Sequence, residues 1–215
     1  MNAFFLIEIL IEIHILMATN SLIMKKLLLF AFAILSFVSI GQGERPTHLD
    51  PTEVASRYTE EIIQNLKIKY PIFKVFEFKD KLGTHELVMT EHPTSDKNND
   101  SIKAYCYLVK SNERALEWQL NDFIAWEEGT TPETSIWFWT RYLRLVDVDN
   151  NGTVDPIIVY GTSDKNGAEN GRLKLLFYVN GKKHAIRHVN NDMDWGRNTR
   201  IDESYYELPA VCRVY

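Results

Sequence analysis

The feature that most restricts the fold of this chain is a series of short segments in which apolar and polar side chains alternate. In SIKAYCYLV, residues 101–109, apolar side chains recur at every second position from Ile102 to Leu108. A period of two is expected of a β-strand with one buried face. Comparable segments lie at residues 72–79, 85–91, 115–124, 135–146, 156–161, 172–179 and 183–189. The sequence therefore predicts about eight strands.

The links between these segments are short, and one of them is the dipeptide Asn180-Gly181 between LLFYV and KHAIRHV. Asn-Gly between two β segments is a strong signal for a two-residue hairpin, because both residues tolerate a positive φ. Short links of this kind join antiparallel neighbours. We expect a mainly β (α+β) fold, arranged as an antiparallel meander, a sandwich-like pair of sheets or a partial-propeller sheet, with one N-terminal helix.

One segment has the pattern of a helix. In LDPTEVASRYTEEIIQNLKI, Asp50 suits the N-cap, Pro51 the first helical position and Glu53 a capping box. An apolar stripe follows at intervals of four residues, at Val54, Tyr58, Ile62 and Leu66. Pro71 prevents any continuation. We expect one leading helix over residues 50–68.

The N-terminal region has the layout of a secretory signal peptide. From Met24, the segment MKKLLLFAFAILSFVSIGQG begins with lysines, continues with an apolar run and ends in small residues. Ser39 and Gly41 fit the small positions of a cleavage site before Gln42. We therefore assign residues 1–41 to an N-terminal extension and signal peptide, and residues 42–215 to a single β-rich domain.

Residues 1–23 are also apolar but contain Glu8 and Glu12. They are either a first transmembrane helix, in which acidic groups would be costly, or an over-extended start. We favour translation from Met24, because the signal that begins there is complete. The protein is then exported to the periplasm, the extracellular medium or the cell surface, and no stable membrane span remains after cleavage.

The charge of the chain argues against nucleic acid as a partner. Lys and Arg total 24 against 29 Asp and Glu, which gives a formal net charge of -5. No basic stripe is present to neutralise phosphate groups. We expect no nucleic-acid binding.

An acidic loop lies in LRLVDVDNNGTVDPIIVYG, residues 143–161. Oxygen-bearing side chains recur at every second position, and Gly152 allows the sharp turn that wraps them around one ion. A helix-flanked calcium loop of the EF-hand type would have Glu at Ile158, and the flanks here are strands, so this is not an EF-hand. The predicted ligands of a structural Ca²⁺ are Asp147, Asp149, Asn151, Thr153 (through its carbonyl) and Asp155.

The alternative is a polar turn without an ion, because Asp, Asn and Gly are good turn formers. Converging carboxylates would repel one another without a cation, which favours calcium. With calcium bound, Asp147→Ala should lower thermal stability and should leave the calcium-free protein almost unchanged.

The span from about His85 to Leu208 resembles a family of uncharacterised exported bacterial proteins, sometimes labelled surface polysaccharide biosynthesis proteins. The matching pieces are IKAYCYLV, NDFI, LVDVDNNGTVDPIIVYG, RLKLLFYVNGKKHAIR and DESYYELP. The acidic loop itself resembles the Asp-rich calcium loops of integrin-type β-propeller repeats. The family often has Glu at the position of Asp155. The resemblance implies an envelope location and a β fold, and it carries over no reaction.

Two pairs of residues are further candidates. In an oxidising compartment Cys106 and Cys212 are able to form a disulfide, while a buried free thiol at Cys106 is the alternative. Trp137 and Trp139 lie on one face of a strand and are candidates for stacking on sugar rings, or else pack at the rim of the core.

No catalytic motif stands out, so an enzyme is the less favoured class. The first hypothesis is a secreted or periplasmic, calcium-stabilised β domain that acts as a binding or accessory protein of the cell envelope, with an envelope protein or a polysaccharide as its partner. The alternative is a glycan-binding module or a glycan-acting enzyme of surface polysaccharide metabolism. Tryptophans that share one cleft with paired acids, Glu127–Glu128 or Asp192–Asp194, would favour the alternative.

Overall fold

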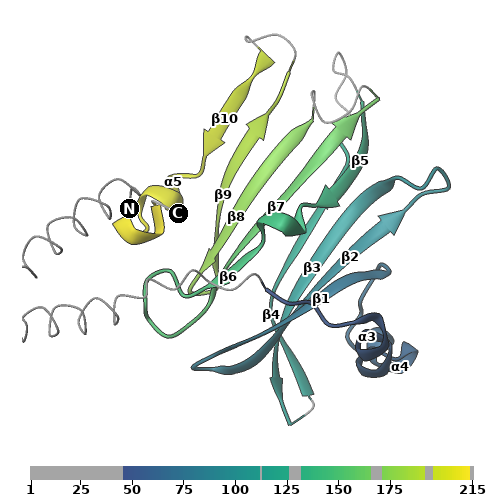
Figure 1. Cartoon of the computed structure of the whole chain (residues 1–215). Coiled ribbons are helices and arrows are strands. Elements are labelled where there is room, and N and C mark those ends of the chain that lie inside the picture. Colours follow the sequence, from purple (N-terminus) through teal and green to yellow (C-terminus); the bar gives the residue numbers. More distant parts are fainter. Residues whose placement is uncertain (1–45, 112, 126–131, 166–170, 192–195, 214–215) are drawn as a thin grey trace, which may run out of the picture. The chain divides into compact units, whose positions relative to one another are not determined.

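The computed structural model describes residues 46–111, 113–125, 132–165, 171–191 and 196–213. They belong to one compact unit, Arg45–Tyr215 (Figure 1). The extension and signal peptide expected at residues 1–41 lie outside the described residues. Within the described part of the chain, no helix has the length and apolar character needed to cross a bilayer.

The first sheet is a four-stranded antiparallel meander in the order β1-β2-β3-β4. Its strands are β1 (Ile72–Asp80), β2 (Gly83–Pro93), β3 (Asn99–Lys110) and β4 (Glu113–Phe123). They correspond to four of the segments with alternating side chains.

The second sheet has six strands in the order β10-β9-β8-β7-β5, and β6 also pairs with β7. Its strands are β5 (Glu133–Phe138), β6 (Arg144–Val146), β7 (Asp155–Asp164), β8 (Arg172–Val179), β9 (Lys182–Val189) and β10 (Asn198–Ile201). All pairs are antiparallel. The expected mainly β fold with antiparallel sheets is therefore confirmed.

The predicted hairpin at Asn180-Gly181 joins β8 to β9 with a two-residue loop, since Val179 pairs with Lys182. Asn180 has φ 50° and Gly181 φ 72°. Both residues thus adopt the positive φ that a type I′ turn requires.

The long strand expected over residues 135–146 is broken into β5 and β6. The 3₁₀-helix η1 (Thr140–Tyr142) separates them, and both parts pair with β7. The N–H of Trp139 still donates to the carbonyl of Val159, after which the chain turns. Leu143 is only 1% exposed and belongs to the main core. The break therefore places Leu143 in the core.

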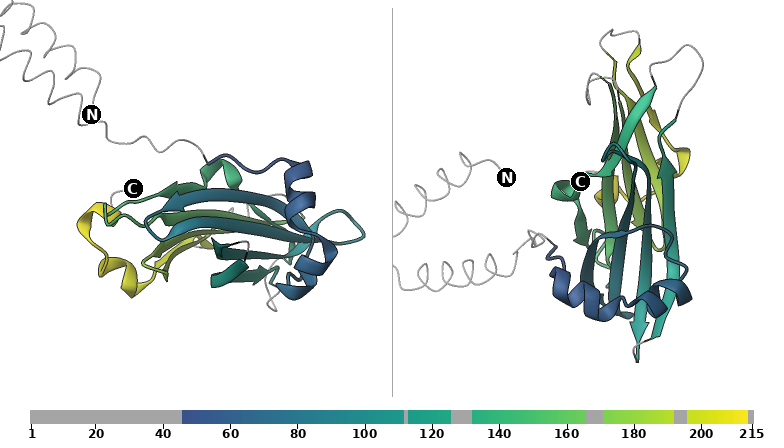
Figure 2. Two further views of the ribbon diagram at one scale, coloured as in Figure 1. Left: turned by 90° about the horizontal axis from the view of Figure 1, so that it is seen from below. Right: turned by 90° about the vertical axis from the view of Figure 1, so that its right-hand side faces the viewer.

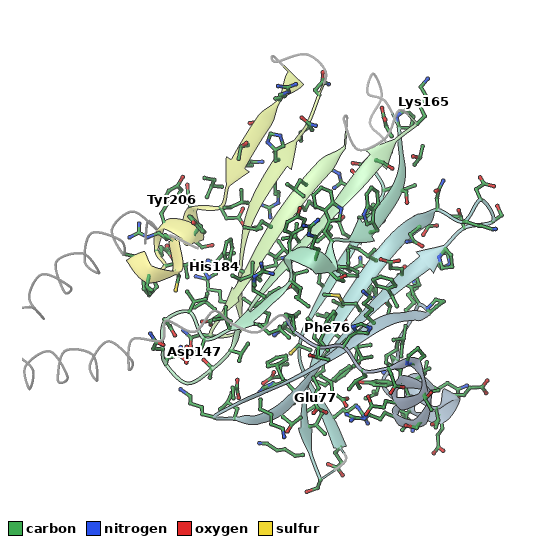
Figure 3. All side chains as sticks on the ribbon, in the orientation of Figure 1. Phe76, Glu77, Asp147, Lys165, His184 and Tyr206 are labelled. Atoms are coloured by element: carbon green, nitrogen blue, oxygen red, sulfur yellow. The ribbon has the colours of Figure 1, made fainter. Side chains whose placement is uncertain are left out.

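The inner faces of the two sheets share one hydrophobic core (Figures 2 and 3). Phe76, which is labelled in Figure 3, lies where they meet. The first sheet contributes Phe76, Leu87, Met89, Ile102, Ala104 and Leu120, and the second contributes Ile136, Phe138, Ile158, Tyr160, Leu176, Tyr178 and Ala185. Burial of this apolar surface is the main force that holds the sheets together.

The helix expected over residues 50–68 is divided into α3 (Pro51–Arg57) and α4 (Glu60–Asn65). Asp50 forms the predicted capping box with Glu53. The hydroxyl of Thr59 accepts the N–H of Ile62, so Thr59 is a second N-cap. A residue that caps a new helix adopts extended φ/ψ and ends the previous helix.

The two helices cover the outer face of the first sheet. Their apolar residues pack with Val75, Val88 and Tyr105 in a second core cluster. A buried ionic network also holds the helices against the first sheet, because Glu86 accepts hydrogen bonds from Arg114, Arg57 and Tyr58. A carboxylate that is 2% exposed needs such partners.

The C-terminal segment packs on the second sheet. It comprises α5 (Glu203–Tyr206) and the 3₁₀-helix η4 (Ala210–Arg213). Leu208 and Cys212 join Val148 and Phe177 in a third core cluster. Val148 belongs to the acidic loop, so this third cluster includes part of that loop.

Candidate metal centre

The acidic loop connects β6 to β7, and Asp155 is the first residue of β7. Figure 3 labels Asp147 in this loop. Carboxylate oxygens of Asp147, Asp149 and Asp155 all lie within 4.8 Å of one another. Three of the five predicted ligands are thus brought together.

The turn is built around the carboxylate of Asp147. Its two oxygens accept the N–H groups of Asn151 at 3.0 Å and of Gly152 at 2.7 Å. Gly152 has φ 87°, and a Cβ at this position would lie 2.9 Å from Cδ of Lys81. Glycine is therefore required both by the backbone conformation and by the close neighbour.

The other two predicted ligands bind each other. Asn151 Oδ1 accepts the N–H of Thr153 at 2.8 Å and also its hydroxyl. Both lone pairs of this oxygen are therefore occupied, and a cation bound by Asn151 would displace one of these donors, such as the hydroxyl of Thr153.

Asp155 is the buried member of the group, with 1% of its surface exposed. Its Oδ2 accepts the N–H of Val148 at 3.0 Å. Its Oδ1 is buried and has no hydrogen-bond partner among the described residues. Burial, with the nearby charges of Asp149 and Asp147, raises the pKa of Asp155 to about 6, against the opposing effects of the backbone N–H groups of Val148 and Asn180. A buried oxygen without a partner is costly unless a cation or a proton satisfies it.

The loop is also tied to the first sheet. Lys81, in the β1–β2 turn, donates its N–H to the carbonyl of Gly152 at 2.9 Å and its ammonium group to the carbonyl of Asn151. Asp80 Oδ2 accepts the N–H of Val154 at 3.2 Å. The acidic loop therefore bridges the two sheets.

These donors suit a hard cation. All three clustered ligands are carboxylates, and the nearby Asn151 adds an amide oxygen. Calcium takes about six to eight oxygen ligands and accepts irregular geometry, whereas magnesium requires a near-ideal octahedron. The loop thus fits calcium better than magnesium or a transition metal.

A second cluster, which the sequence analysis missed, lies between the sheets. Ligand atoms of His85 on β2, Cys106 on β3 and Glu117 on β4 lie within 4.8 Å of one another. His85 Nδ1 is 2.9 Å from Glu117 Oε2, and the thiol of Cys106 donates to the same oxygen at 3.7 Å. Burial, reinforced by Glu117, raises the pKa of the Cys106 thiol.

A β-bulge in β4 creates this cluster. Cys106 pairs with Trp118 while Tyr107 pairs with Leu116, which leaves Glu117 as the extra residue. Trp118 therefore packs against the core, whereas Leu116, two residues earlier in the strand, is 51% exposed. Bulges redirect side chains in this way, and only knowledge of the register would have revealed it.

The cluster lines a cavity of about 280 Å³ beside the acidic loop. Trp118 and Tyr178 stack there with ring centroids 3.8 Å apart. The hydroxyl of Tyr178 is buried and has no hydrogen-bond partner among the described residues. Further lining residues are Phe78, Asp80, Leu82, Thr153, Val154 and Pro156.

The predicted glycan-stacking residues lie on the face of the second sheet that is turned away from the inner cavity. The rings of Trp137 and Trp139 are 6.4 Å apart, and Trp139 lies over Gly161. A shallow, mainly apolar groove of about 470 Å³ begins at Trp139 and Tyr142 and continues along β7 and β8. Trp126, Trp195 and the two acid pairs named above lie outside the described residues.

The predicted disulfide is not formed. Cys106 and Cys212 are both free and buried. Cys106 lies in the first sheet and Cys212 in the C-terminal cluster. Burial raises the pKa of Cys212 as well, so neither thiol has the character of a reactive nucleophile.

Comparison of the chain with protein-family models, with curated proteins and with solved structures found no match. The resemblance to exported envelope proteins stays a prediction. Function is therefore argued from the sites alone.

Proposed function

We propose that the protein is an exported β domain, stabilised by calcium, that acts as a binding or accessory protein of the cell envelope. The observation that carries the calcium assignment is the buried Oδ1 of Asp155, which lies without a partner beside the carboxylates of Asp147 and Asp149. A cation at this point would satisfy that oxygen and cancel the repulsion among the three groups. The export assignment rests on the signal-peptide pattern before Gln42.

The ion would have a structural role. The acidic loop contacts Asp80 and Lys81 of the first sheet and leads directly into β7 of the second. Fixing the loop therefore stabilises the contact between the sheets. Sites of this kind in extracellular modules have dissociation constants of about 0.1 to 1 mM, so 1 mM calcium should add roughly 0.4 to 1.4 kcal/mol to the free energy of unfolding.

The position of the tryptophans supports a binding role over catalysis. Trp118 lines the inner cavity, whereas Trp139 lies in the groove on the outer face. The described tryptophans thus do not gather in one cleft. An extended apolar surface with aromatic residues suits a partner that is bound and not transformed.

Calorimetric titration of the purified, chelator-treated protein with calcium and with magnesium tests the metal assignment. We expect one calcium to bind, with magnesium much weaker, and binding to be lost in Asp155→Asn. Asp96→Asn is the matched control, because Asp96 is an exposed loop carboxylate outside the cluster. Equal calcium binding by wild type and Asp155→Asn would mean that the acidic loop is a polar turn and not the calcium site.

A glycan-binding module is the second candidate, favoured by Trp139 and Tyr142 at the mouth of the groove. Tryptophan fluorescence during titration with soluble envelope polysaccharide tests it. We expect quenching in wild type and its loss in Tyr142→Ala, since Tyr142 is 49% exposed and its removal should not disturb the core. The control is Tyr206→Ala, another exposed tyrosine, which does not line the groove.

A further inference from the structure

We propose that His85, Cys106 and Glu117 form a second metal site, for Zn²⁺, with one open coordination position facing the inner cavity. The site is separate from the calcium loop and does not depend on it. Its donors come from three neighbouring strands of the first sheet.

The three donors already stand close to the positions that zinc requires. Around a tetrahedral zinc, with bonds of about 2.0 Å to nitrogen or oxygen and about 2.3 Å to sulfur, ligand atoms lie about 3.3 to 3.5 Å apart. His85 Nδ1 and Glu117 Oε2 are 2.9 Å apart, and Cys106 Sγ is 3.7 Å from the same oxygen. All three ligand atoms lie within 4.8 Å of one another, so side-chain rotations would admit the ion, and zinc would replace the protons between these atoms.

The bulge in β4 is an observation that points to the same site. Without the extra residue, Glu117 would alternate with Trp118 and point to the opposite face of the sheet. The bulge instead directs its carboxylate to His85 and Cys106. Disrupting a strand to bring a carboxylate to a histidine and a thiol is typical of a functional site.

The residues around His85 have the arrangement that zinc sites use. His85 Nε2, the ring nitrogen that faces away from Glu117, is 2.9 Å from Asp80 Oδ1. A carboxylate in this position fixes the orientation and tautomer of a metal-bound imidazole. His85 also stacks on Phe78 with the ring planes 7° apart. The imidazole is therefore held in place before any ion arrives.

The open position is supported by Tyr178. This residue is 3% exposed, lines the cavity, and its hydroxyl has no partner among the described residues. A water molecule on the zinc is a group that this hydroxyl could bind. Three protein ligands with a water are the coordination of zinc sites that act on substrates.

The donor set selects the metal. A thiolate with an imidazole suits zinc, cobalt or copper and not calcium or magnesium. The side chain of Glu117 is 29% exposed, which gives an ion a path from solvent to the buried Cys106. Zinc is the choice among these because it needs no redox partner and favours four ligands.

Titration of the purified, chelator-treated protein with Co²⁺, followed by competition with Zn²⁺, tests the site. A cobalt–thiolate bond gives a charge-transfer band in the near ultraviolet, which oxygen ligands alone do not. We expect one equivalent of cobalt to produce this band and zinc to remove it. The band should vanish in Cys106→Ala and persist in Cys212→Ala, the matched buried thiol. Absence of the band in wild type, or its survival in Cys106→Ala, would overturn the proposal.

Because Cys106 is buried, its substitution risks unfolding, and Glu117→Gln is a second variant that should fold. We expect it to weaken cobalt and zinc binding at least tenfold. Glu113→Gln, an exposed acid on the same strand, is the control and should bind as wild type does. Asp155→Asn should keep the cobalt band, which separates this site from the calcium loop. Unchanged affinity in Glu117→Gln would contradict the proposal.

Discussion

Asp80 joins His85 to the acidic loop through the two oxygens of one carboxylate. Oδ1 lies 2.9 Å from His85 Nε2, and Oδ2 accepts the N–H of Val154 at 3.2 Å. Although burial raises it, these contacts and the N–H of Leu82 lower the pKa of Asp80. The Asp80 carboxylate therefore contacts a residue of each of the two proposed metal sites.

Asp155→Asn should stabilise the calcium-free protein and remove the stabilisation that calcium gives the wild type. The pKa of Asp155 is raised to about 6 in the folded protein, above its ordinary value of 3.8, so ionisation at neutral pH opposes folding. Without calcium, the neutral amide should raise the free energy of unfolding by roughly 1 to 3 kcal/mol. Calcium at 1 mM should stabilise the wild type by roughly 0.4 to 1.4 kcal/mol and the variant not at all, so the advantage of the variant should shrink. Urea unfolding near neutral pH, with and without calcium, measures both effects, and an equal response of the two proteins to calcium would contradict the calcium site.

Asp147→Ala should lower stability with calcium and, to a smaller extent, without it. The sequence alone predicted almost no effect in calcium-free protein. The structure shows Asp147 accepting the N–H groups of Asn151 and Gly152, so alanine leaves two donors of the turn unsatisfied. We expect a loss of about 1 to 2 kcal/mol without calcium. Thermal melting in a chelator measures it, and an unchanged melting temperature would mean that water replaces the carboxylate at no cost.

Glu86→Gln should reduce stability at neutral pH and weaken its dependence on acid. Burial raises the pKa of Glu86, but Arg114, Tyr58 and Arg57 lower it below its ordinary value of 4.5. The charged form therefore stabilises the fold above this value, and the contribution is lost as the pH falls through the lowered pKa. Removing the charge leaves Arg114 without its partner and should cost about 3 to 5 kcal/mol.

Unfolding of wild type and Glu86→Gln by urea, from neutral pH to below 4.5, checks this prediction. Glu77→Gln is the control, because Glu77 also binds Arg57 but is half-buried. The free energies of unfolding of wild type and Glu86→Gln should converge as the pH falls. Parallel profiles would show that Glu86 does not contribute to the acid sensitivity.

Gly152→Ala should cost more than Gly181→Ala. Both glycines have a positive φ, so each substitution carries about 1 kcal/mol of backbone strain. A Cβ at Gly181 meets nothing within 4 Å, whereas at Gly152 it lies 2.9 Å from Cδ of Lys81. Adding Lys81→Ala should recover the steric part of the loss, although it also removes the contact with Asn151. Thermal melting of the single and double variants checks this order. Equal losses of stability at the two glycines would show that the contact with Lys81 has no energetic effect.

The strands could be located from the sequence because each has one face on a core, which imposes the period of two. The second helix cap at Thr59 was overlooked because the apolar stripe of α3 and α4 continues across it. In residues 135–146 the burial of Leu143 overrides local β propensity. Local patterns cannot reveal such tertiary effects.

The acidic loop was predictable because its ligands are close in sequence. The cluster of His85, Cys106 and Glu117 was not, because its members come from three strands and meet only in one register with one bulge. A shift of one residue in either pairing would separate them. The pairing of Cys106 with Cys212 was allowed by composition alone, and the structure has both thiols free, one in the first sheet and one in the C-terminal segment.

The two free thiols have a consequence for how the protein would mature. Both cysteines of the chain are free in the structure, so the proposed export would add no disulfide between them. If the domain is exported as proposed and its acidic loop binds calcium only at millimolar concentration, it would remain in the looser, calcium-free form during synthesis and translocation. Arrival in the calcium-rich medium would then complete its maturation, with no oxidising enzyme required.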